Sequence, residues 1–462
     1  MRALPSHTVI GAGPVGTLMA LMLANRGHIV RLIERRPDPR LSAPEGGRSI
    51  NLAMAARGTA ALEQAGLLKR LAPTMMPMPG RMLHDLHGGV QFMPYGQNEG
   101  EVIHALGREQ LNRILIEAAA QCPHIELRFD TRCLDVEPGG RSVALHDERA
   151  GRSYAESFEV LLGTDGAGSA VRAALAARGL IRAHEQPLDH DYKELAIPPP
   201  PARAGGYAFE PRALHIWPRG GYMLIALPNT DGSFTATLFL ARLGAPGVPG
   251  FDRMSSAVAV RAFFHAQFSD AAAVIPELAA QFASHPQSRL GTLYCERWQI
   301  DGRILLLGDA AHAIVPFHGQ GLNCGFEDCR LLDRLLGELG AVGDARTRAA
   351  LFERFERERR PDTAAIAAMA LENYEEMRDT VRSPMFARRQ LLAAELERRY
   401  PGRFIPRYSM VMFHPEIPYA EAQRRGLAQA RVLDALLADS ALSDLGSMPL
   451  GRIESLLEQA GL

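Results

Sequence analysis

The chain has 462 residues, 47% of them hydrophobic, and a formal net charge of −1. This length exceeds what one ordinary hydrophobic core organises, so we expect more than one domain. A nearly neutral chain produces no field that would favour nucleic acid or anionic lipid, so neither is expected as a partner and a small molecule is expected instead.

The cysteines and the apolar segments bear on the compartment. The five cysteines form no Cys-x-x-Cys pair, and their odd number argues for reduced thiols in a cytosol. The first apolar strand begins within a few residues of the N-terminus, which leaves no room for a signal peptide. No uninterrupted apolar run reaches the ~20 residues that a membrane span requires. We therefore expect a cytoplasmic protein without a membrane anchor, as a monomer or a homodimer.

The first elements form a βαβ unit. Residues 7–10 are a short apolar strand, and residues 11–27 predict a tight turn followed by a helix. Residues 29–33 are the next strand, which closes with Glu34.

The turn of this unit carries a Gly-x-Gly-x-x-Gly fingerprint at Gly11, Gly13 and Gly16. The first glycine of such a fingerprint makes the turn, the second admits a pyrophosphate, and the third lets helix and strand pack closely. The pyrophosphate would lie on the helix N-terminus, and Glu34 could accept hydrogen bonds from ribose hydroxyls. An ordinary glycine turn is the alternative, but the flanking strand, helix and acid favour dinucleotide binding.

Two later strands also end in an acid beside a glycine. The apolar strand at 160–163 leads to Asp165 and its following glycine, and the apolar strand at 303–307 leads to a glycine followed by Asp309. Three such turns imply one long cofactor laid across the edge of a parallel sheet. The alternative for Asp309 is an aspartate that only caps a helix.

The segment between these two strands has a different pattern. Residues 205–240 alternate apolar and polar side chains between Gly, Pro, Asn and Asp, which is typical of antiparallel strands. After the strand at 303–307, a glycine turn at 319–321 starts a helix, and from residue 346 onward the composition is helical. The first domain is therefore expected to be discontinuous.

His312 and His318 could suggest a metal site near the glycine turn. No carboxylate or cysteine stands at a helical ligand spacing that would complete such a site, so we expect no metal.

In this order, the fingerprint, the Asp-Gly motif and the Gly-Asp motif resemble the FAD-dependent aromatic hydroxylases. Longer segments are similar to one family of that class, the kynurenine 3-monooxygenases, and extend in register from residue 9 to about residue 425. The helical tail resembles that of the soluble bacterial members. The similar segments are GRSINLAMAARG (47–58), GRMLHDLHG (80–88), MPYG (93–96), DYKELAIPP (191–199), LHIWPR (214–219), FTATLFL (234–240), VPFHGQGLNCGFEDC (315–329), ENYEEMR (372–378) and RYSMVMFHPEIPY (407–419).

The resemblance implies an α/β fold, with a Rossmann-like FAD-binding domain, an inserted antiparallel-sheet substrate domain and a C-terminal helical region. The FAD-binding domain would comprise residues 1–75, 101–185 and 296–380. The substrate domain would comprise residues 76–100 and 186–295, and the helical region residues 381–462.

The resemblance also implies tightly bound, non-covalent FAD, with Asp309 on its ribityl chain. The helix after the 319–321 turn would point its N-terminus at the pyrimidine edge of the flavin, where reduced flavin carries negative charge. The full set of expected cofactor contacts is Gly11, Gly13, Val15, Gly16, Glu34, Arg35, Ala53, Arg108, Asp165, Asp309, Leu322 and Asn323.

The implied substrate, L-kynurenine, has a carboxylate at one end and an aniline ring at the other. Arginine offers a fork that matches a carboxylate, and tyrosine offers a directed O–H donor. By resemblance, Arg81, Tyr95, Asn373 and Tyr408 are the substrate contacts. Phe239 would line the ring pocket, with an ordinary core position as the alternative. For His318, loop packing and lining of the active site are equally open.

The implied activity is hydroxylation of L-kynurenine to 3-hydroxykynurenine with NADPH and O2, through a flavin C4a-hydroperoxide. This reaction belongs to tryptophan degradation and to NAD biosynthesis through quinolinate, and it needs no side chain as nucleophile or base. A monooxygenase of the same build acting on a substituted kynurenine is the nearest alternative. A flavin dehydrogenase that never activates O2 is a more distant one.

Overall fold

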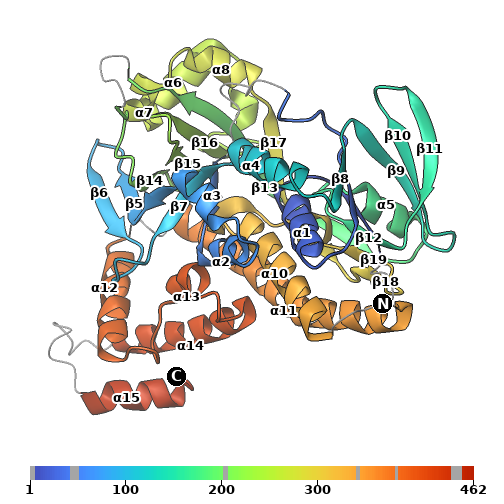
Figure 1. Cartoon of the computed structure of the whole chain (residues 1–462). Helices are drawn as coiled ribbons and strands as arrows, with labels where there is room; N and C mark the ends of the chain where they lie inside the picture. The colour runs from blue at the N-terminus through green and yellow to red at the C-terminus, as the bar shows by residue number, and fades with distance from the viewer. Residues whose placement is uncertain (1–5, 42–50, 201–205, 340–343, 380–382, 439–449) are drawn as a thin grey trace. The chain divides into compact units, whose positions relative to one another are not determined.

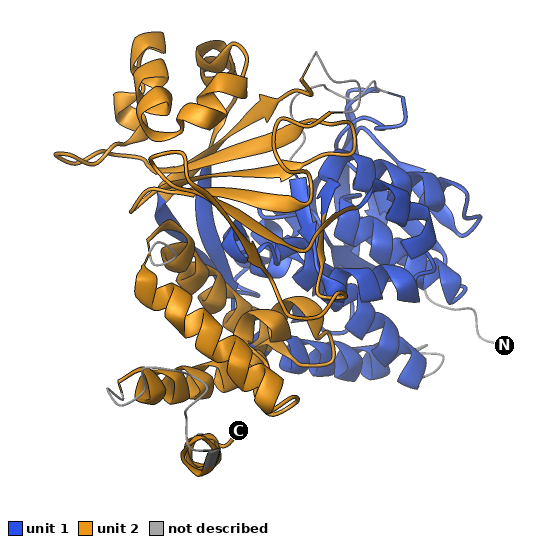
Figure 2. Ribbon diagram, turned by 90° about the vertical axis from the view of Figure 1, so that its left-hand side faces the viewer, with its two compact units in different colours: residues 1–75, 105–189, 289–361 blue, residues 76–104, 190–288, 362–462 orange. Residues whose placement is uncertain are grey.

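The computed structural model describes residues 6–41, 51–200, 206–339, 344–379, 383–438 and 450–462. The start of the GRSINLAMAARG segment therefore lies outside the described residues. The chain divides into two compact units, each built from three segments (Figure 2). Unit 1 comprises residues 1–75, 105–189 and 289–361, and unit 2 comprises residues 76–104, 190–288 and 362–462.

Unit 1 is organised around a six-stranded sheet in the order β18-β19-β12-β1-β2-β8, in which only the β18–β19 pair is antiparallel. Strands β1 and β12 are buried along their whole length, as expected for parallel strands covered on both faces. The strands are β1 (His7–Ile10), β2 (Val30–Ile33), β8 (Ile125–Arg128), β12 (Val160–Gly163), β18 (Gln299–Ile300) and β19 (Ile304–Leu306).

Helices pack against this sheet through one continuous apolar core. Helix α1 contacts both α4 and α10, and α10 also packs along α2. The helices that begin in unit 1 are α1 (Pro14–Asn25), α2 (Ala56–Gln64), α3 (Leu68–Leu71), α4 (Arg108–Ala120), α5 (Ala170–Ala177), α9 (Asp309–His312), α10 (Gly321–Leu339) and α11 (Ala345–Arg378), with 3-10 turns η1 (Ala72–Thr74) and η3 (Pro316–His318).

The remaining strands of unit 1 are short or peripheral. A three-stranded antiparallel sheet has the order β11-β10-β9, and α5 packs on β9. Its strands are β9 (Thr131–Glu137), β10 (Ser142–Asp147) and β11 (Arg152–Ser157), and strand β3 (Asn51–Met54) precedes α2.

Unit 2 is organised around a seven-stranded sheet in the order β17-β13-β16-β15-β14-β5-β6. The pairs β13–β16, β16–β15, β15–β14 and β5–β6 are antiparallel, and the pair β14–β5 is parallel. Strands β13 and β17 extend beyond the unit's sequence bounds. The strands are β5 (Gly80–His84), β6 (Val90–Pro94), β13 (Ala183–Ile197), β14 (Ala213–Pro218), β15 (Met223–Pro228), β16 (Phe234–Ala241) and β17 (Gln287–Cys295). The short β4 (Met76–Met78) precedes them, and β7 (Ile103–Gly107) follows β6 in the chain.

One face of this sheet is covered by three short helices, α6 (Ala257–Gln267), α7 (Ser269–Val274) and α8 (Leu278–Ser284), which follow the 3-10 turn η2 (Phe251–Arg253) (Figure 1). Alternate residues of the strands, among them Trp217 and Leu238, form the core under these helices. Because successive side chains of a strand point to opposite faces, the intervening residues face away from α6–α8.

A buried polar cluster fixes β5 under α7. His84 Nδ1 lies 2.8 Å from Asp270 Oδ2, and His84 Nε2 lies 2.8 Å from His215 Nδ1. His215 Nε2 donates to the carbonyl oxygen of Glu210, so its Nδ1 accepts from His84 Nε2. The His84 ring also stacks on Trp217, with ring centroids 4.1 Å apart.

The C-terminal part of unit 2 is helical. The second half of α11 is followed by α12 (Pro384–Arg399), α13 (Arg407–Phe413), α14 (Tyr419–Leu437) and α15 (Leu450–Gln459). Three of these helices, α12, α14 and α15, share a small apolar core. No helix in the described part of the chain is long and apolar enough to cross a membrane.

Candidate active site

The carboxyl ends of the parallel strands in unit 1 bring the predicted cofactor turns together. The order β19-β12-β1-β2 places the turn after each strand beside its neighbour. A Cβ on Gly11 would lie 2.7 Å from the Cα of Asp165, and one on Gly308 would lie 3.3 Å from Val15. The fingerprint turn, the Asp165 turn and the Asp309 turn thus form one continuous edge, as the sequence predicts.

The three fingerprint glycines have different surroundings. Gly11 has φ of 100°, which favours glycine, and a Cβ on Gly16 would lie 2.0 Å from the backbone oxygen of Gly11. A Cβ on Gly13, by contrast, would meet nothing within 4 Å. Gly13 is the N-cap of α1 and supplies no side-chain hydrogen bond to the helix. The first turn of α1 therefore offers open room and uncapped backbone N–H groups, which suit a pyrophosphate.

The acids of the three turns are used in three different ways. Glu34 is buried at the end of β2, where its carboxylate accepts the N–H of Ala12 at 2.8 Å. Asp165 accepts the N–H of Ala170 at 2.6 Å and the hydroxyl of Ser169 at 2.6 Å, so it caps α5. Burial raises the pKa of Asp165, and these hydrogen bonds oppose the rise.

Asp309 differs from the other two acids. It is exposed, it is the first residue of α9, and its carboxylate has no hydrogen-bond partner among the described residues. A carboxylate held at a sheet edge without a partner fits a ligand that donates hydroxyl groups, as the ribityl chain of FAD does. The residues present in unit 1 therefore fit FAD.

Asn323 organises the glycine turn from the first part of α10. Its Oδ1 accepts the N–H of Ala55 at 2.9 Å, and its Nδ2 donates to the carbonyl oxygens of Ala53 and Gly319 at 2.8 Å each. Asn323 is fully buried, whereas the neighbouring Leu322 is half-buried. Asn323 thus joins the predicted contact Ala53 to the 319–321 turn.

The other predicted cofactor contacts are less well defined. Arg35 and Arg108 are exposed, at the end of β2 and at the start of α4. Val15 packs against Gly308 and Gly325, which joins α1 to the Asp309 turn and to α10. The roles of these three residues toward FAD stay predictions.

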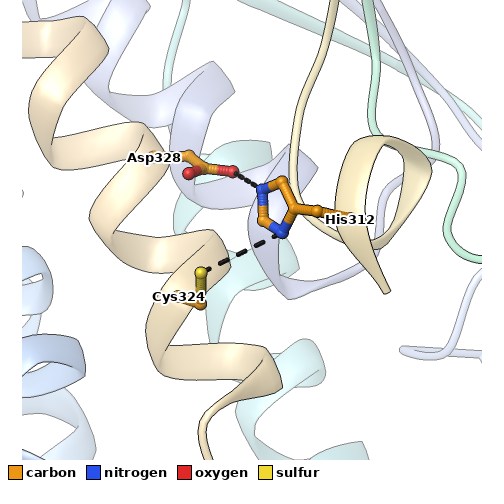
Figure 3. Close-up of side chains that lie close together, drawn as sticks. All are labelled: His312, Cys324 and Asp328. Atoms are coloured by element: carbon orange, nitrogen blue, oxygen red, sulfur yellow. Dashed lines mark hydrogen bonds and ion pairs between the residues drawn. The ribbon is translucent and has the colours of Figure 1, made fainter. Parts of the chain in front are cut away.

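A buried ionic network lies behind the Asp309 turn, and sequence reasoning missed it. His312 Nε2 lies 2.7 Å from Asp328, and Cys324 Sγ lies 3.9 Å from His312 Nδ1 (Figure 3). Arg359 donates to Asp328 at 2.8 Å and to Cys324 Sγ at 3.1 Å, and it also pairs with Glu327. Arg57 donates to the other oxygen of Glu327 at 2.7 Å. No local pattern in the sequence marks this network, because the burial of Arg57 and Arg359 is a property of the fold.

Three members of this network have side chains that can bind a metal ion, although the sequence analysis predicted no metal site. The ligand atoms of His312, Cys324 and Asp328 lie within 4.8 Å of one another. The guanidinium of Arg359, however, already donates to two of the three. Burial alone would lower the pKa of His312, but the Asp328 carboxylate raises it to about 10, so the imidazole is protonated. The positive charges of the Arg359 guanidinium and the His312 imidazolium therefore take the role that a metal ion would have in this cluster.

In unit 2, the predicted carboxylate contacts gather beside the start of β5. The rings of Tyr95 and Tyr408 stack with centroids 5.4 Å apart and an interplanar angle of 16°. Arg81 lies close enough to act electrostatically on both hydroxyl groups. Burial raises the pKa of both tyrosines well above the ordinary value, so both hydroxyls remain protonated. No carboxylate among the described residues pairs with Arg81.

Phe239 lies on the same sheet face as Arg81. The core under α6–α8 contains Leu238, and Phe239 pairs across the sheet with Tyr192 and Met223, so Phe239 points to the opposite face. Arg81 pairs with Leu214, three residues from Trp217, and it also points away from α6–α8. Phe239 is buried, and its ring centroid is 6.2 Å from that of Tyr192.

Asn373 and His318 complete the predicted substrate set. Asn373 is buried on α11 and donates to Met377 Sδ at 3.2 Å. The adjacent Glu372 forms an ion pair with Arg407 at 2.5 Å, and Arg407 directly precedes Tyr408. This pair joins the helices that carry Asn373 and Tyr408. His318 is buried on η3 of unit 1, and its role stays open.

Comparisons with known proteins identify the family of this chain. The model of the FAD binding domain family matches residues 6–370. The kynurenine 3-monooxygenase of Myxococcus xanthus (strain DK1622) is 45% identical over 419 residues, covering 91% of this chain and 88% of its own. That of Stenotrophomonas maltophilia (strain K279a) is 45% identical over 430 residues, covering 93% and 92%.

Solved structures agree on the fold. The tetrameric form of 2-methyl-3-hydroxypyridine-5-carboxylic acid oxygenase superposes with a TM-score of 0.64 at 20% identity, covering 83% of this chain and 95% of its own. The p-nitrophenol 4-monooxygenase PnpA of Pseudomonas putida DLL-E4 gives 0.64 at 18% identity, covering 86% and 94%. The predicted fold class and the predicted FAD cofactor are confirmed. This chain belongs to the kynurenine 3-monooxygenase family of FAD-binding proteins.

Proposed function

We propose that this chain hydroxylates L-kynurenine to 3-hydroxykynurenine with NADPH and O2. The observation that carries the proposal is the half-buried Arg81 beside two buried, protonated tyrosine hydroxyls, with no carboxylate partner among the described residues. A partly desolvated guanidinium needs an anion, and the carboxylate of an amino acid supplies one that accepts both tyrosine O–H groups. Family membership supports the choice of kynurenine.

The side chains of unit 2 act on binding and orientation. Arg81 would bind the substrate carboxylate, while Tyr95 and Tyr408 would donate to it. Asn373 would contribute an amide, and Phe239 would pack against the aromatic ring from the same sheet face as Arg81. Holding the substrate at its carboxylate end fixes which ring carbon is presented for reaction.

The chemistry itself comes from the cofactor. Bound FAD would be reduced by NADPH and would then activate O2 for transfer of one oxygen atom to the ring. The amino group of kynurenine activates the ring carbon ortho to it, so no side chain has to act as nucleophile or base. The buried tyrosine pair helps to keep water away from the bound substrate.

The proposal is tested by following NADPH oxidation by the holoenzyme with and without L-kynurenine and identifying the product by mass. We expect oxidation to accelerate when kynurenine is added, and the product to carry one additional oxygen atom. Kynurenine recovered unchanged, at any rate of NADPH oxidation, would refute the proposed substrate while leaving FAD binding intact.

A substituted kynurenine is the second candidate substrate. Arg81, Tyr95 and Tyr408 would recognise only the amino-acid end that all kynurenines share. Competition between kynurenine and ring-substituted kynurenines, measured as kcat/KM, decides between them. A higher kcat/KM for a substituted compound would make that compound the substrate.

A further inference from the structure

Asp328 contacts the predicted cofactor turn without belonging to any predicted site. It lies on α10, and its side chain is completely buried. One carboxylate oxygen, Oδ2, accepts the N–H of Gly308 at 2.8 Å and lies 2.7 Å from His312 Nε2. Gly308 directly precedes α9 and His312 is the last residue of α9, so a single oxygen holds both ends of the turn of helix that begins with Asp309.

The geometry of this turn requires such a support. Gly308 has φ of 57° and ψ of −142°, and α9 has only four residues, which are too few to be stable alone. The carboxylate of Asp309 has no hydrogen-bond partner of its own among the described residues. Its position is therefore set by the backbone that carries it.

Asp328 is in turn fixed from behind. Its other oxygen, Oδ1, accepts from Arg359 Nε at 2.8 Å, and Arg359 extends to the adjacent Glu327 at 2.9 Å. Three donors converge on the two oxygens, one each from a backbone N–H, a protonated imidazole and a guanidinium. An amide at this position has only one acceptor atom and would turn an N–H group toward another donor.

We propose that Asp328 is a positioning residue for FAD: it holds the Gly308–His312 turn so that the Asp309 carboxylate is preset for the ribityl hydroxyls. Preorganisation of this kind strengthens binding because the turn does not have to be ordered when the cofactor arrives. The inference rests on FAD binding and not on the identity of the aromatic substrate.

The same helix provides a matched control. Asp333 is also a buried aspartate on α10, and it accepts from Arg26 Nε at 2.5 Å and from Gln64 Nε2 at 2.5 Å. These partners lie at the far ends of α1 and α2, away from the Asp309 turn. Asp333→Asn therefore removes a comparable ionic contact of α10 and leaves the Asp309 turn as it is.

The test is the release of FAD from the full-length holoenzyme on dilution, followed by flavin fluorescence, with thermal unfolding measured in excess FAD. For Asp328→Asn we expect the Kd for FAD to rise about tenfold or more, the effect of losing a hydrogen bond to a charged group. For Asp333→Asn we expect a lower Tm but a Kd for FAD within about twofold of the wild type. A normal Kd in Asp328→Asn, or an equal rise in both variants, would overturn the proposal.

A second variant keeps the proposal testable if Asp328→Asn does not fold. His312→Gln loses the charged contact at one end of α9 but keeps Asp328 on the N–H of Gly308. We expect its Kd for FAD to rise about threefold or more, with an altered circular dichroism of the bound flavin. An unchanged Kd together with an unchanged flavin spectrum would refute the role of Asp328.

Discussion

At the scale of single residues, the arrangement around Arg81 gives the sharpest prediction. Replacing Arg81 by alanine removes the guanidinium beside Tyr95 and Tyr408, and Arg81 belongs to unit 2, whereas the candidate FAD turns belong to unit 1. We expect Arg81→Ala to retain FAD and to bind kynurenine about tenfold to a hundredfold more weakly, as for the loss of a charged hydrogen bond. The affinity can be measured from the change in flavin absorbance on titration with kynurenine.

Arg261 provides the control for this prediction, because it is exposed on α6, which covers the sheet face opposite to that of Arg81. Arg261→Ala should bind kynurenine as the wild type does. Wild-type affinity in Arg81→Ala would remove Arg81 from the substrate site.

The charge on His312 predicts how stability depends on pH. The Asp328 carboxylate overcomes the effect of burial and raises the pKa of His312 to about 10, against roughly 6.5 in an unfolded chain. A pKa raised by folding contributes stability that is complete below the unfolded value and is lost as the pH rises through the folded value. We therefore expect the free energy of unfolding to fall between about pH 6.5 and 10, by at most about 1.4 kcal/mol per pH unit.

Urea denaturation at a series of pH values checks this expectation, with His312→Gln as the comparison. The variant should be less stable than the wild type at neutral pH, and its stability should vary less over the same interval. Parallel pH profiles for the two proteins would show that His312 is not the titrating group.

At the scale of elements, two glycines of the fingerprint turn have different expected roles: Gly13 leaves room for the cofactor, and Gly16 lets α1 pack against β1. A Cβ on Gly13 would meet no protein atom within 4 Å, whereas one on Gly16 would lie 2.0 Å from the backbone of Gly11. Gly13→Ala should therefore leave the stability of the FAD-free protein unchanged and weaken FAD binding, because the added methyl group occupies the room over α1. Gly16→Ala should lower both, because α1 can no longer approach β1.

Thermal unfolding without FAD, combined with FAD titration, distinguishes these two outcomes. Loss of stability without loss of FAD affinity in Gly13→Ala would mean that the pyrophosphate does not lie over the first turn of α1.

The elements also show which parts of the site could be predicted from the sequence. The turns at Gly11, Asp165 and Asp309 could be predicted from the sequence, because a local pattern marks each of them: an apolar strand followed by glycine, an acid or both. The same holds for the opposite-facing positions of Phe239 and Leu238, which follow from strand alternation. The network of Asp328, His312 and Arg359 could not be predicted from the sequence. It joins residues up to 47 positions apart, and their contact depends on how α10 and α11 pack.

The metal-type cluster illustrates the same difference. Helical spacing along the sequence gave no reason to group His312 with Cys324 and Asp328, yet the fold brings their ligand atoms within 4.8 Å. The deciding residue, Arg359, comes from a third helix. Long-range pairs of this kind are determined by tertiary packing, which no local pattern records.

At the scale of the whole molecule, the candidate FAD contacts and most of the candidate substrate contacts lie in different units. The candidate FAD contacts lie in unit 1, while Arg81, Tyr95, Phe239, Asn373 and Tyr408 lie in unit 2. Each unit is assembled from three chain segments, so neither set of candidate contacts comes from a continuous stretch of sequence. The expected boundaries of the FAD-binding domain, the substrate domain and the helical region stay predictions. The two units are defined by how compactly the chain packs and not by what each part binds.

The central claim is that one oxygen atom of O2 enters the ring of kynurenine on this protein. It is tested most directly by turnover of kynurenine and NADPH under isotopically labelled O2, with the product analysed by mass and by fragmentation. We predict 3-hydroxykynurenine with the label in its ring hydroxyl group. A product without label, or oxidation of NADPH that leaves kynurenine unchanged, would contradict the account.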